Sequence, residues 1–319
     1  MNDSLQVRVR AITWEAEGVL GFELVPLAAH GLLPAFDAGA HVELQLPGGL
    51  RRSYSLLNAP GERQRYCIAV HRDAHSRGGS RWLHEQAHAG HTLCISAPRN
   101  LFPLDETAPL SVLIAGGIGI TPLLAMAQRL AALGRPWVLH QAARSRAHAP
   151  FLPQLQALAA ASGGRLQPHF DDEAGRVLDV AAIVAALPAG AHVYCCGPQA
   201  MLAAFEAACA ALPRGRVHLE RFAARDAPAS DGGFTVRLHR SGREVPVARG
   251  QTILDALHAC GIEPLYACGQ GVCGTCQVAV IAGVPDHRDL VQSEAEKATN
   301  THIMICCSGS KTPELELDL

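Results

Sequence analysis

Three cysteines in one short loop, YACGQGVCGTC, have a spacing that could hold a metal centre. Cys268, Cys273 and Cys276 follow the pattern C-x4-C-x2-C, and a fourth thiol, Cys306, comes after 29 further residues. This is the plant-type spacing in which four thiolates bind the two irons of a [2Fe-2S] cluster. Structural zinc sites supply ligands as pairs separated by about two to four residues, and no second pair follows here. The spacing therefore favours a redox cluster over zinc.

The fourth ligand must be chosen between two adjacent cysteines, Cys306 and Cys307. Neighbouring side chains on an extended strand point to opposite faces, so only one of them can face the cluster. We assign Cys306 and interpret Cys307 as a packed thiol. The glycines Gly269, Gly271 and Gly274 allow the loop to wrap closely, with backbone N–H groups pointing at the sulfurs.

The segment around these cysteines resembles the plant-type ferredoxin domain at the C-terminal end of reductases in the phthalate dioxygenase reductase and vanillate demethylase reductase family. The likeness extends through GVPDHRDLV, IMICCS and the terminal LELDL. In that family Ser commonly precedes the first cluster cysteine, and Ala267 stands in its place here. The resemblance implies a small β-grasp domain that carries the cluster.

A second candidate site is the segment RRSYSLL, which contains Arg52, Ser53, Tyr54 and Ser55. Its R-x-Y-S pattern resembles the flavin motif of the ferredoxin-NADP reductase superfamily. An Arg can fix a phosphate, an aromatic ring can cover one flavin face, and a small hydroxyl can approach the reactive ring nitrogen. The motif therefore predicts a flavin site, with Ser55 near the nitrogen that accepts the hydride.

A glycine-rich segment downstream, SRGGSRWLHEQ, precedes a predicted helix. Backbone N–H groups and a helix N-terminus at this point make an anion site. The family resemblance implies that R-G-G-S helps to hold the phosphate of FMN, and FAD is the alternative because the wider superfamily mostly uses it. The residues predicted to hold the flavin here are Arg77, Gly78, Gly79 and Ser80, with Ala69, Val70 and His71 on the preceding strand.

A glycine-rich turn in LIAGGIGITPLLAM ends an apolar run and opens a predicted helix. Pro suits the first helical turn, and exposed N–H groups there can receive a pyrophosphate. Later, VYCCGPQAM resembles the C-G-P element that places a cysteine beside the nicotinamide ring in these reductases. The predicted nicotinamide site comprises Gly116, Gly117, Gly119, Thr121, Pro122, Cys196, Gly197 and Pro198. Thr121 and Cys196 are predicted to orient the ring, and Cys195 is expected to lie in the core on the opposite side of its strand.

The choice of coenzyme depends on the acidic segment FDDEAGR, which follows a predicted strand. Carboxylates at this position would repel an adenosine 2′-phosphate, and Asp171 could accept a ribose hydroxyl. This pattern favours NADH, as in the resembled family. NADPH is the alternative, because Arg144 and Arg146 follow another strand and could bind a phosphate.

The secondary structure that positions these residues can be predicted from the pattern of apolar and polar residues along the chain. Short runs of alternating apolar and polar residues, such as LQVRVRAITW and HVELQLP, predict an antiparallel β-barrel. Apolar runs alternating with Ala- and Leu-rich stretches then predict a doubly wound α/β sheet covered on both faces. After AARDAPASDGG, we expect a hairpin turning at Ser241 and Gly242 and a short helix in TILDALHACG. The expected domains are an FMN-binding β-barrel at 1–104, an NAD-binding α/β domain at 105–225, a linker at 226–232 and a [2Fe-2S] ferredoxin domain at 233–319.

Composition limits the partners and the location. The 319 residues carry 27 basic and 29 acidic side chains, so the formal net charge is −2 and no excess charge favours nucleic acid or a membrane surface. No apolar run approaches the roughly 20 residues that cross a bilayer, and the N-terminal sequence lacks a signal-peptide pattern. We expect a cytoplasmic monomer, in which disulfides among the eleven cysteines are disfavoured.

The motifs occur in the order flavin, nicotinamide and iron–sulfur, and the family resemblance covers essentially the whole chain. It implies an NADH-dependent reductase that passes electrons from NADH to FMN, to the [2Fe-2S] cluster and on to the Rieske-type oxygenase component of an aromatic-ring mono- or dioxygenase or O-demethylase. One alternative is a stand-alone flavin and iron–sulfur NAD(P)H oxidoreductase with another protein acceptor. Another is a cofactor-bearing sensor that does not turn over.

Overall fold

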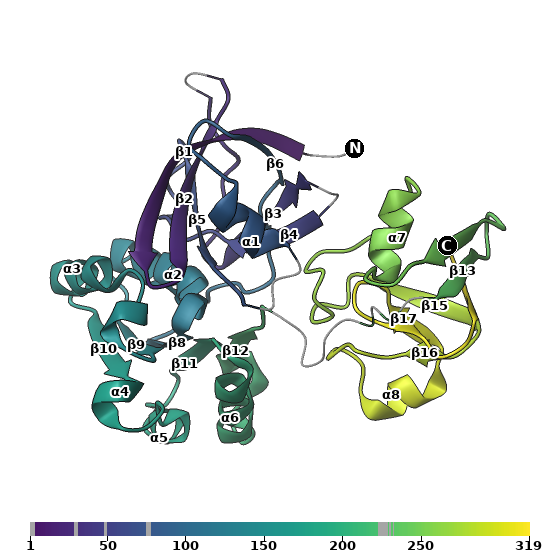
Figure 1. Ribbon diagram of the computed structural model, residues 1–319. Helices are drawn as coiled ribbons and strands as arrows, with labels where there is room; N and C mark the ends of the chain where they lie inside the picture. Colours follow the sequence, from purple (N-terminus) through teal and green to yellow (C-terminus); the bar gives the residue numbers. More distant parts are fainter. Residues whose placement is uncertain are drawn as a thin grey trace. The chain divides into compact units, whose positions relative to one another are not determined.

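The computed structural model describes residues 4–28, 31–47, 50–74, 78–222, 229, 231 and 233–319. The chain divides into two compact units, Met1–Glu220 and Arg221–Leu319 (Figure 1). The first unit contains an antiparallel sheet followed by a parallel sheet, and the second contains a smaller mixed sheet. Among the described residues, no helix is both long enough and apolar enough to cross a membrane.

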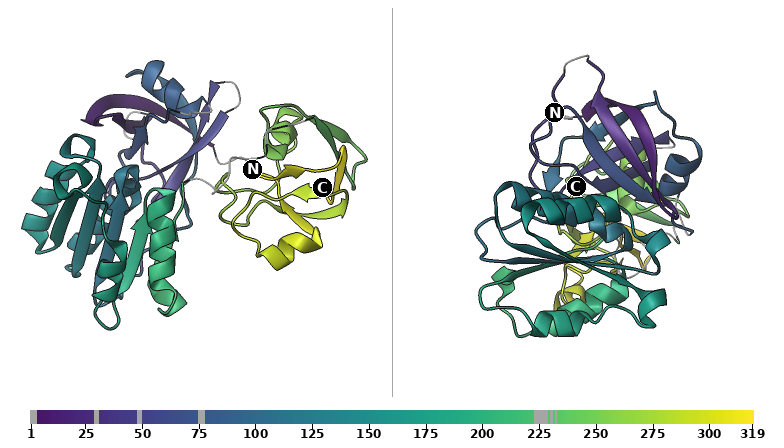
Figure 2. Two further views of the ribbon diagram at one scale, coloured as in Figure 1. Left: turned by 60° about the horizontal axis from the view of Figure 1, so that its bottom comes forward. Right: turned by 90° about the vertical axis from the view of Figure 1, so that its left-hand side faces the viewer.

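Alternating apolar residues build the β-barrel that begins the first unit. Side chains such as Val7, Val9 and Leu44 are fully buried in its core, while their polar neighbours face outward. Six strands follow the order β4-β3-β6-β1-β2-β5, β7 pairs with β3, and the end strands β4 and β5 contact each other, so the sheet curls round (Figure 2). The elements are β1 (Ser4–Ala16), β2 (Val19–Pro26), β3 (Ala40–Leu46), β4 (Leu50–Ser55), β5 (Tyr66–His71), α1 (Gly79–Glu85), β6 (Thr92–Ser96) and β7 (Arg99–Asn100).

A parallel sheet follows in the order β10-β9-β8-β11-β12. Its central strand β8 (Ser111–Gly116) is buried at every position, as expected for an apolar strand covered on both faces. Helices α2 and α3 contribute to the core on one face, and α5 and α6 to the core on the other (Figure 2). The other elements are α2 (Ile120–Ala132), β9 (Trp137–Ala143), α3 (Leu152–Ser162), β10 (Arg165–Phe170), α4 (Asp171–Ala174), α5 (Val180–Ala185), β11 (His192–Cys196), α6 (Gln199–Cys209) and β12 (Val217–Glu220).

The barrel and the parallel sheet share one apolar core. Leu57 and Ala69 from the barrel belong to the same buried cluster as Leu123 and Met126 of α2. At this contact Gln128 Nε2 donates a hydrogen bond of 2.7 Å to the Leu57 carbonyl. The first helix of the parallel sheet is therefore fixed directly against the barrel.

The second unit is a β-grasp domain in which helix α7 packs on a mixed sheet of order β14-β13-β19-β15-β17. Thr252 caps α7, because its side chain accepts from the Asp255 N–H while the Asp255 carboxylate accepts from the Thr252 N–H. The short strands β16 and β18 pair beside this sheet. The elements are β13 (Phe234–Leu238), β14 (Glu244–Val247), α7 (Ile253–Ala259), β15 (Gln277–Ala282), β16 (Pro285–Asp286), α8 (Glu294–Thr299), β17 (His302–Met304), β18 (Gly309–Ser310) and β19 (Glu314–Leu317).

The predicted fold class is confirmed in all three parts, as are the hairpin at Ser241 and Gly242 and the helix in TILDALHACG. Three short elements, α4, β12 and α8, were not predicted, although the capping box of Ser293 and Glu296 signals the start of α8. The domain boundaries stay predictions, and most of the expected linker lies outside the described residues.

Two loops meet at the carboxyl edge of the parallel sheet, where the strand order reverses between β8 and β11. Such an edge is where open α/β sheets bind ligands. A Cβ on Gly119 would lie 2.2 Å from the Cys196 carbonyl oxygen and 2.8 Å from the Gly197 nitrogen. Only glycine allows this approach, because both neighbours are backbone atoms that cannot turn aside.

We expect Gly119→Ala to destabilise the protein by about 1–3 kcal/mol, the usual cost of overpacking, and to weaken NADH binding. Thermal unfolding and NADH titration measure the two effects. Gly215→Ala is the matched control, since a Cβ on Gly215 meets no heavy atom within 4 Å. Equal unfolding temperatures for the two variants would contradict the close approach.

Candidate flavin, nicotinamide and iron–sulfur sites

Strand β4 presents the R-x-Y-S residues and pairs with β3 along its whole length. Arg52, Ser53 and Tyr54 are partly exposed, whereas Ser55 is buried at the end of the strand. Burial raises the pKa of Tyr54 to about 12, although the nearby charge of Arg52 acts to lower it. A neutral aromatic ring beside a guanidinium suits a flavin ring and its phosphate.

The glycine pair at the start of α1 lies against β4. Gly78 has a φ of 97°, a conformation that favours glycine. A Cβ on Gly79 would lie 2.7 Å from Arg52 Cγ, so the missing side chain lets the helix start contact Arg52. Ser80 lies in the first turn of α1, and Arg77 lies outside the described residues.

Strand β5 forms the remaining side of the predicted flavin site. Ala69 and Val70 are buried, and His71 is exposed at the strand end. His84 Nε2 of α1 donates to the Val70 carbonyl at 2.9 Å. Because α1 contacts both β4 and β5, the predicted flavin residues of the two strands come together around one short helix.

The two predicted nicotinamide segments form one surface at the carboxyl edge. Gly117, with a φ of 53°, bends the chain into α2, whose first turn buries Thr121 and Pro122. A Cβ on Gly116 would lie 2.5 Å from Pro198 Cδ, and one on Gly197 would lie 3.1 Å from the Gly116 Cα. The Thr121 hydroxyl donates to the Ile118 carbonyl at 3.0 Å, which holds it in the turn.

Cys196 ends β11, in register with Ala115 of β8 and Glu220 of β12. It is fully buried, and burial raises the pKa of its thiol well above the usual range. The thiol is therefore neutral. Cys195 lies in the core cluster formed with α5 and α6, as predicted for the opposite side of the strand.

Glu220 is a candidate site residue that the motifs did not reveal. Burial raises the pKa of its carboxyl group to about 8, and its Oε2 atom has no hydrogen-bond partner among the described residues. A carboxyl group with a strongly raised pKa beside a ligand-binding crevice is typical of functional sites. The only signal in the sequence was the short alternating run VHLE, which forms β12.

The acidic segment after β10 forms α4, which begins at Asp171. Asp171 Oδ1 lies 3.4 Å from His169 Nε2. Arg146 makes an ion pair of 2.6 Å with Glu173, and its guanidinium lies 4.6 Å from the centre of the Phe170 ring. The Arg146 side chain is thus already held by a carboxylate and an aromatic ring.

The four predicted cluster ligands converge in the second unit. The Cys268 thiol interacts with those of Cys273 and Cys306, and the Cys306 thiol also interacts with that of Cys276. Within the described ranges, no three His, Cys, Asp or Glu side chains close around a single metal ion. A two-iron cluster needs two thiolates for each iron, so the neighbouring pairs Cys268–Cys273 and Cys276–Cys306 fit it better than one central ion.

Backbone N–H groups point at the ligand sulfurs. Gln270 donates to Cys268 Sγ at 3.3 Å, and Gly271 donates to Cys306 Sγ at 3.2 Å. Hydrogen bonds, first from the Cys273 and Cys306 thiols, lower the pKa of Cys268. Thiolates held by main-chain donors suit an iron–sulfur cluster. The Cys307 sulfur instead faces the Gly271 Cα, since a Cβ there would lie 2.4 Å from it.

Comparisons with known protein families match two segments of the chain. Residues 113–207 match the oxidoreductase NAD-binding domain, and residues 236–310 match the 2Fe-2S iron-sulfur cluster binding domain. These matches cover the predicted nicotinamide edge and the cysteine constellation. The presence of both modules in one chain supports the predicted cofactors.

Relatives and a solved structure match over nearly the whole chain. The phenoxybenzoate dioxygenase subunit beta of Ectopseudomonas oleovorans is 58% identical over 315 residues, covering 99% of this chain and 97% of its own. The tetrachlorobenzoquinone reductase of Sphingobium chlorophenolicum is 49% identical over 319 residues, covering 99% and 98%. The structure of phthalate dioxygenase reductase, described as modular for electron transfer from pyridine nucleotides to [2Fe-2S], superposes with a TM-score of 0.88 at 37% identity, covering 99% and 98%. The chain therefore belongs to the phthalate dioxygenase reductase family of oxidoreductases, as the motifs predicted.

Proposed function

We propose that this protein transfers electrons from NADH through FMN and a [2Fe-2S] cluster to a Rieske-type oxygenase component. The observation that carries the proposal is the cysteine loop, where main-chain N–H groups meet converging thiols in a chain that also holds a nucleotide-binding sheet edge. When bound, the flavin accepts hydride from NADH and the cluster accepts single electrons. The protein supplies the residues that would hold and orient these groups.

The first unit supplies the flavin and nicotinamide contacts. Arg52 and the start of α1 hold the FMN phosphate, and Tyr54 covers one face of the flavin ring. Ser55 lies at the buried end of β4, where its hydroxyl can approach the ring. Thr121 and Cys196 orient the nicotinamide at the carboxyl edge, and the adjoining glycine turns receive the pyrophosphate.

Glu220 keeps a proton at this edge. Because burial raises the pKa of its carboxyl group to about 8, the group is neutral at physiological pH and can donate a hydrogen bond. Its position in register with Cys196 places it at the predicted nicotinamide site. A neutral acid and a neutral thiol avoid placing a charge beside the hydride.

NADH is the proposed coenzyme rather than NADPH. Asp171 begins α4 directly after β10, at the edge where a ribose hydroxyl can be accepted. Arg146, one of the two arginines that could bind a phosphate together with Arg144, is already paired with Glu173 at 2.6 Å. A 2′-phosphate would have to compete with that carboxylate.

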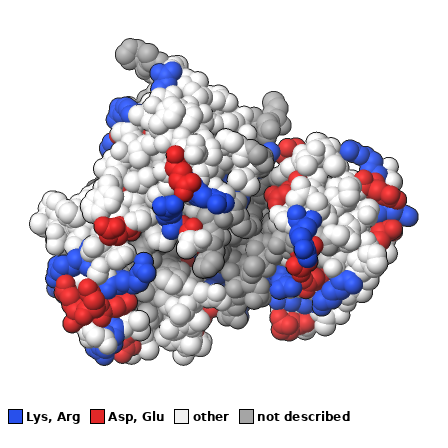
Figure 3. All heavy atoms as spheres, in the orientation of Figure 1, with Lys and Arg blue, Asp and Glu red and all other residues white. Residues whose placement is uncertain are grey.

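The partner is proposed from the relatives and from the charge of the second unit. Residues 234–319 contain ten acidic and seven basic residues, a net of −3. Figure 3 shows Lys and Arg interspersed with Asp and Glu on the visible surface rather than one field of a single sign. The modest negative net charge could steer docking to a basic patch on the partner. The domain boundaries, the monomeric state and the cytoplasmic location stay predictions.

A second candidate acceptor is a quinone, because one relative is named a tetrachlorobenzoquinone reductase. The two candidates differ in their need for the cysteine loop. Quinone reduction that continues in a variant without the cluster would favour direct reduction at the flavin. Dependence of every acceptor on the cluster would favour the proposed protein partner.

Cys273→Ser should leave bleaching of the flavin by NADH intact while reduction of cytochrome c falls to background, because the one-electron exit is lost. Stopped-flow absorbance and steady-state assays measure the two steps. Cys260→Ser is the control and should keep both, since the Cys260 side chain is exposed and lies outside the cysteine loop. Normal cytochrome c reduction by Cys273→Ser would refute the electron route.

Arg52→Gln should weaken FMN binding by about 10- to 100-fold, because a charge-assisted hydrogen bond to phosphate is lost. Titration of the flavin-free protein with FMN, followed by fluorescence, measures the affinity. Arg51→Gln is the matched control, since Arg51 points to the other side of the strand and lies 3.7 Å from Glu43. Equal affinities for the two variants would argue against a phosphate contact at Arg52.

Glu220→Gln should become more stable relative to the wild type as pH rises. The folded-state pKa of Glu220 is raised from 4.5 to about 8, so the wild type loses stability as pH rises through this window and the loss is complete above it. Thermal unfolding between about pH 5 and about pH 9 measures the difference. The exposed Glu17→Gln serves as the control. A pH-independent difference for Glu220→Gln would contradict the raised pKa.

A further inference from the structure

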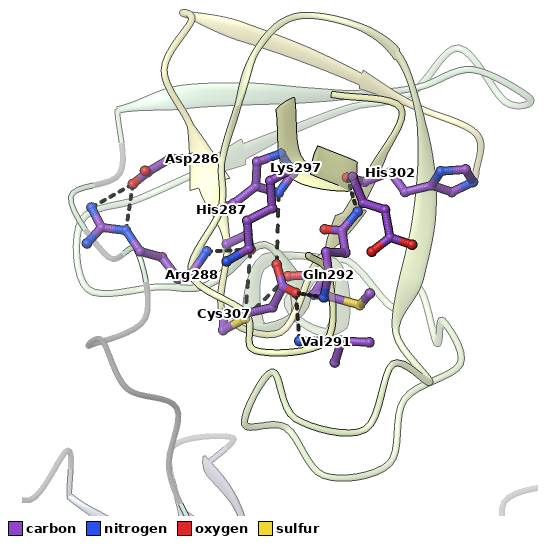
Figure 4. A network of polar contacts seen from close by, with 12 residues as sticks. Asp286, His287, Arg288, Val291, Gln292, Lys297, His302 and Cys307 are labelled. Carbon is purple, nitrogen blue, oxygen red and sulfur yellow. Dashed lines mark hydrogen bonds and ion pairs between the residues drawn. The ribbon is translucent and has the colours of Figure 1, made fainter. Parts of the chain in front are cut away.

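A buried carboxylate, Asp289, lies behind the cysteine loop. It is 1% exposed, and its Oδ1 atom accepts the N–H groups of Val291 (3.0 Å) and Gln292 (2.8 Å) in the network of Figure 4. Among the described residues Oδ2 has no hydrogen-bond partner, and it lies 3.9 Å from His287 Nδ1. Burying a carboxylate costs folding free energy. A turn that is capped by a buried carboxylate therefore suggests that its shape is important.

The turn capped by Asp289 is hydrogen-bonded to the centre of the cysteine loop. Leu290 lies between Asp289 and Val291, the first donor to its carboxylate. It donates its own N–H to the Gly271 carbonyl at 2.9 Å. Gly271 in turn donates its own N–H to Cys306 Sγ at 3.2 Å. Two hydrogen bonds and the intervening backbone of Leu290 and Gly271 therefore connect the turn of Asp289 to a predicted cluster ligand.

Gly271 fits a slot with two walls. Its φ of 68° favours glycine, and a Cβ there would lie 2.4 Å from Cys307 Sγ and 3.3 Å from the Asp289 Cα. The Gly271 Cα thus lies between these two groups, and they leave no room for a side chain. Cys307, which is not assigned as a ligand, forms one wall, and the turn of Asp289 forms the other.

The same turn is anchored to the segment that carries Cys306. Arg288 donates its N–H to Ser308 Oγ at 3.1 Å, and Asp286 of β16 pairs with Gly309 of β18. Asp289 therefore lies where the cysteine loop and the segment after the fourth ligand are joined. A shift of its turn would change the distance between Gly271 and Cys306.

We propose that Asp289 is a positioning residue that holds the Gly271 N–H on the Cys306 sulfur and thereby sets the reduction potential of the cluster. The inference rests on the proposed cluster at the four cysteines. Hydrogen bonds to the sulfurs and net charge both set such potentials. An N–H donor stabilises the more negative, reduced state, so its loss lowers the potential, whereas loss of a nearby carboxylate charge raises it. The two effects have opposite signs.

The test is an EPR-monitored redox titration of the full-length holoprotein and its variants. Asp289→Ala and Asp289→Asn both remove the charge, but only Asp289→Ala also removes the acceptor of the turn. The cluster potential of Asp289→Ala should therefore lie below that of Asp289→Asn, by up to about a tenfold change in the reduction equilibrium constant for one hydrogen bond, or ~59 mV for a one-electron couple. Asp289→Asn keeps an oxygen acceptor and removes the charge, so its potential should equal or exceed that of the wild type. Asp286→Asn is the control, because Asp286 pairs with the Arg288 side chain at 2.8 Å outside this path.

Equal cluster potentials in the Asp289→Ala and Asp289→Asn variants, or a higher potential in Asp289→Ala, would overturn the positioning role. If the Asp289→Ala variant does not assemble a cluster, Asp289→Ser is tested in its place. The Ser side chain is shorter and has one oxygen atom, so it can accept fewer of the N–H groups of the turn. A cluster reduction potential in Asp289→Ser below that in Asp289→Asn then supports the positioning role. A potential equal to or above that in Asp289→Asn overturns it. A wild-type protein without the [2Fe-2S] signal would overturn the proposed cluster itself, which distinguishes that failure from the failure of this inference.

Discussion

The close approach of Gly119 to the peptide between Cys196 and Gly197 is the constraint on which the first unit depends. It brings the turns after β8 and β11 together, and α2 begins from that point. The same helix packs against the barrel, where Gln128 reaches the Leu57 carbonyl. One backbone contact therefore fixes the nucleotide edge, and a shared apolar core carries that placement to the flavin strands. A side chain in place of the glycine would disturb both sites at once.

The cysteine loop uses the same physical device for a different group. Gly271 lies between two walls, and its N–H points at the Cys306 sulfur, so a glycine again allows backbone donors to reach an anionic partner. Main-chain dipoles can hold a pyrophosphate or a thiolate without charged side chains. This explains how a chain with a formal net charge of only −2 can hold several anionic groups.

Two carboxyl groups stand out against these neutral donors. Asp289 is 1% exposed, and Glu220 is partly exposed but has a buried Oε2 atom. Glu220 retains its proton beside Cys196, whereas Asp289 uses its Oδ1 atom to cap a turn. Burial of such groups lowers stability unless their contacts compensate. Each lies directly behind a predicted site, which is where a protein tolerates that cost. Glu220 and Asp289 indicate that residues behind the predicted cofactor contacts also help to define the sites.

The sequence by itself determined the cofactor set, the fold class and the order of the modules. These features depend on short contiguous segments, such as the cysteine spacing, the glycine turn at Gly117 and the R-x-Y-S strand, whose chemistry is local. The sequence did not reveal β12 or α4, because four-residue elements with interleaved charges give too few periods to recognise. Only the tertiary structure decided that Glu220 stands in register with Cys196 and that the turn of Asp289 grips Gly271. Those contacts join segments that are distant in the chain, and they are fixed by strand register and packing rather than by any local pattern.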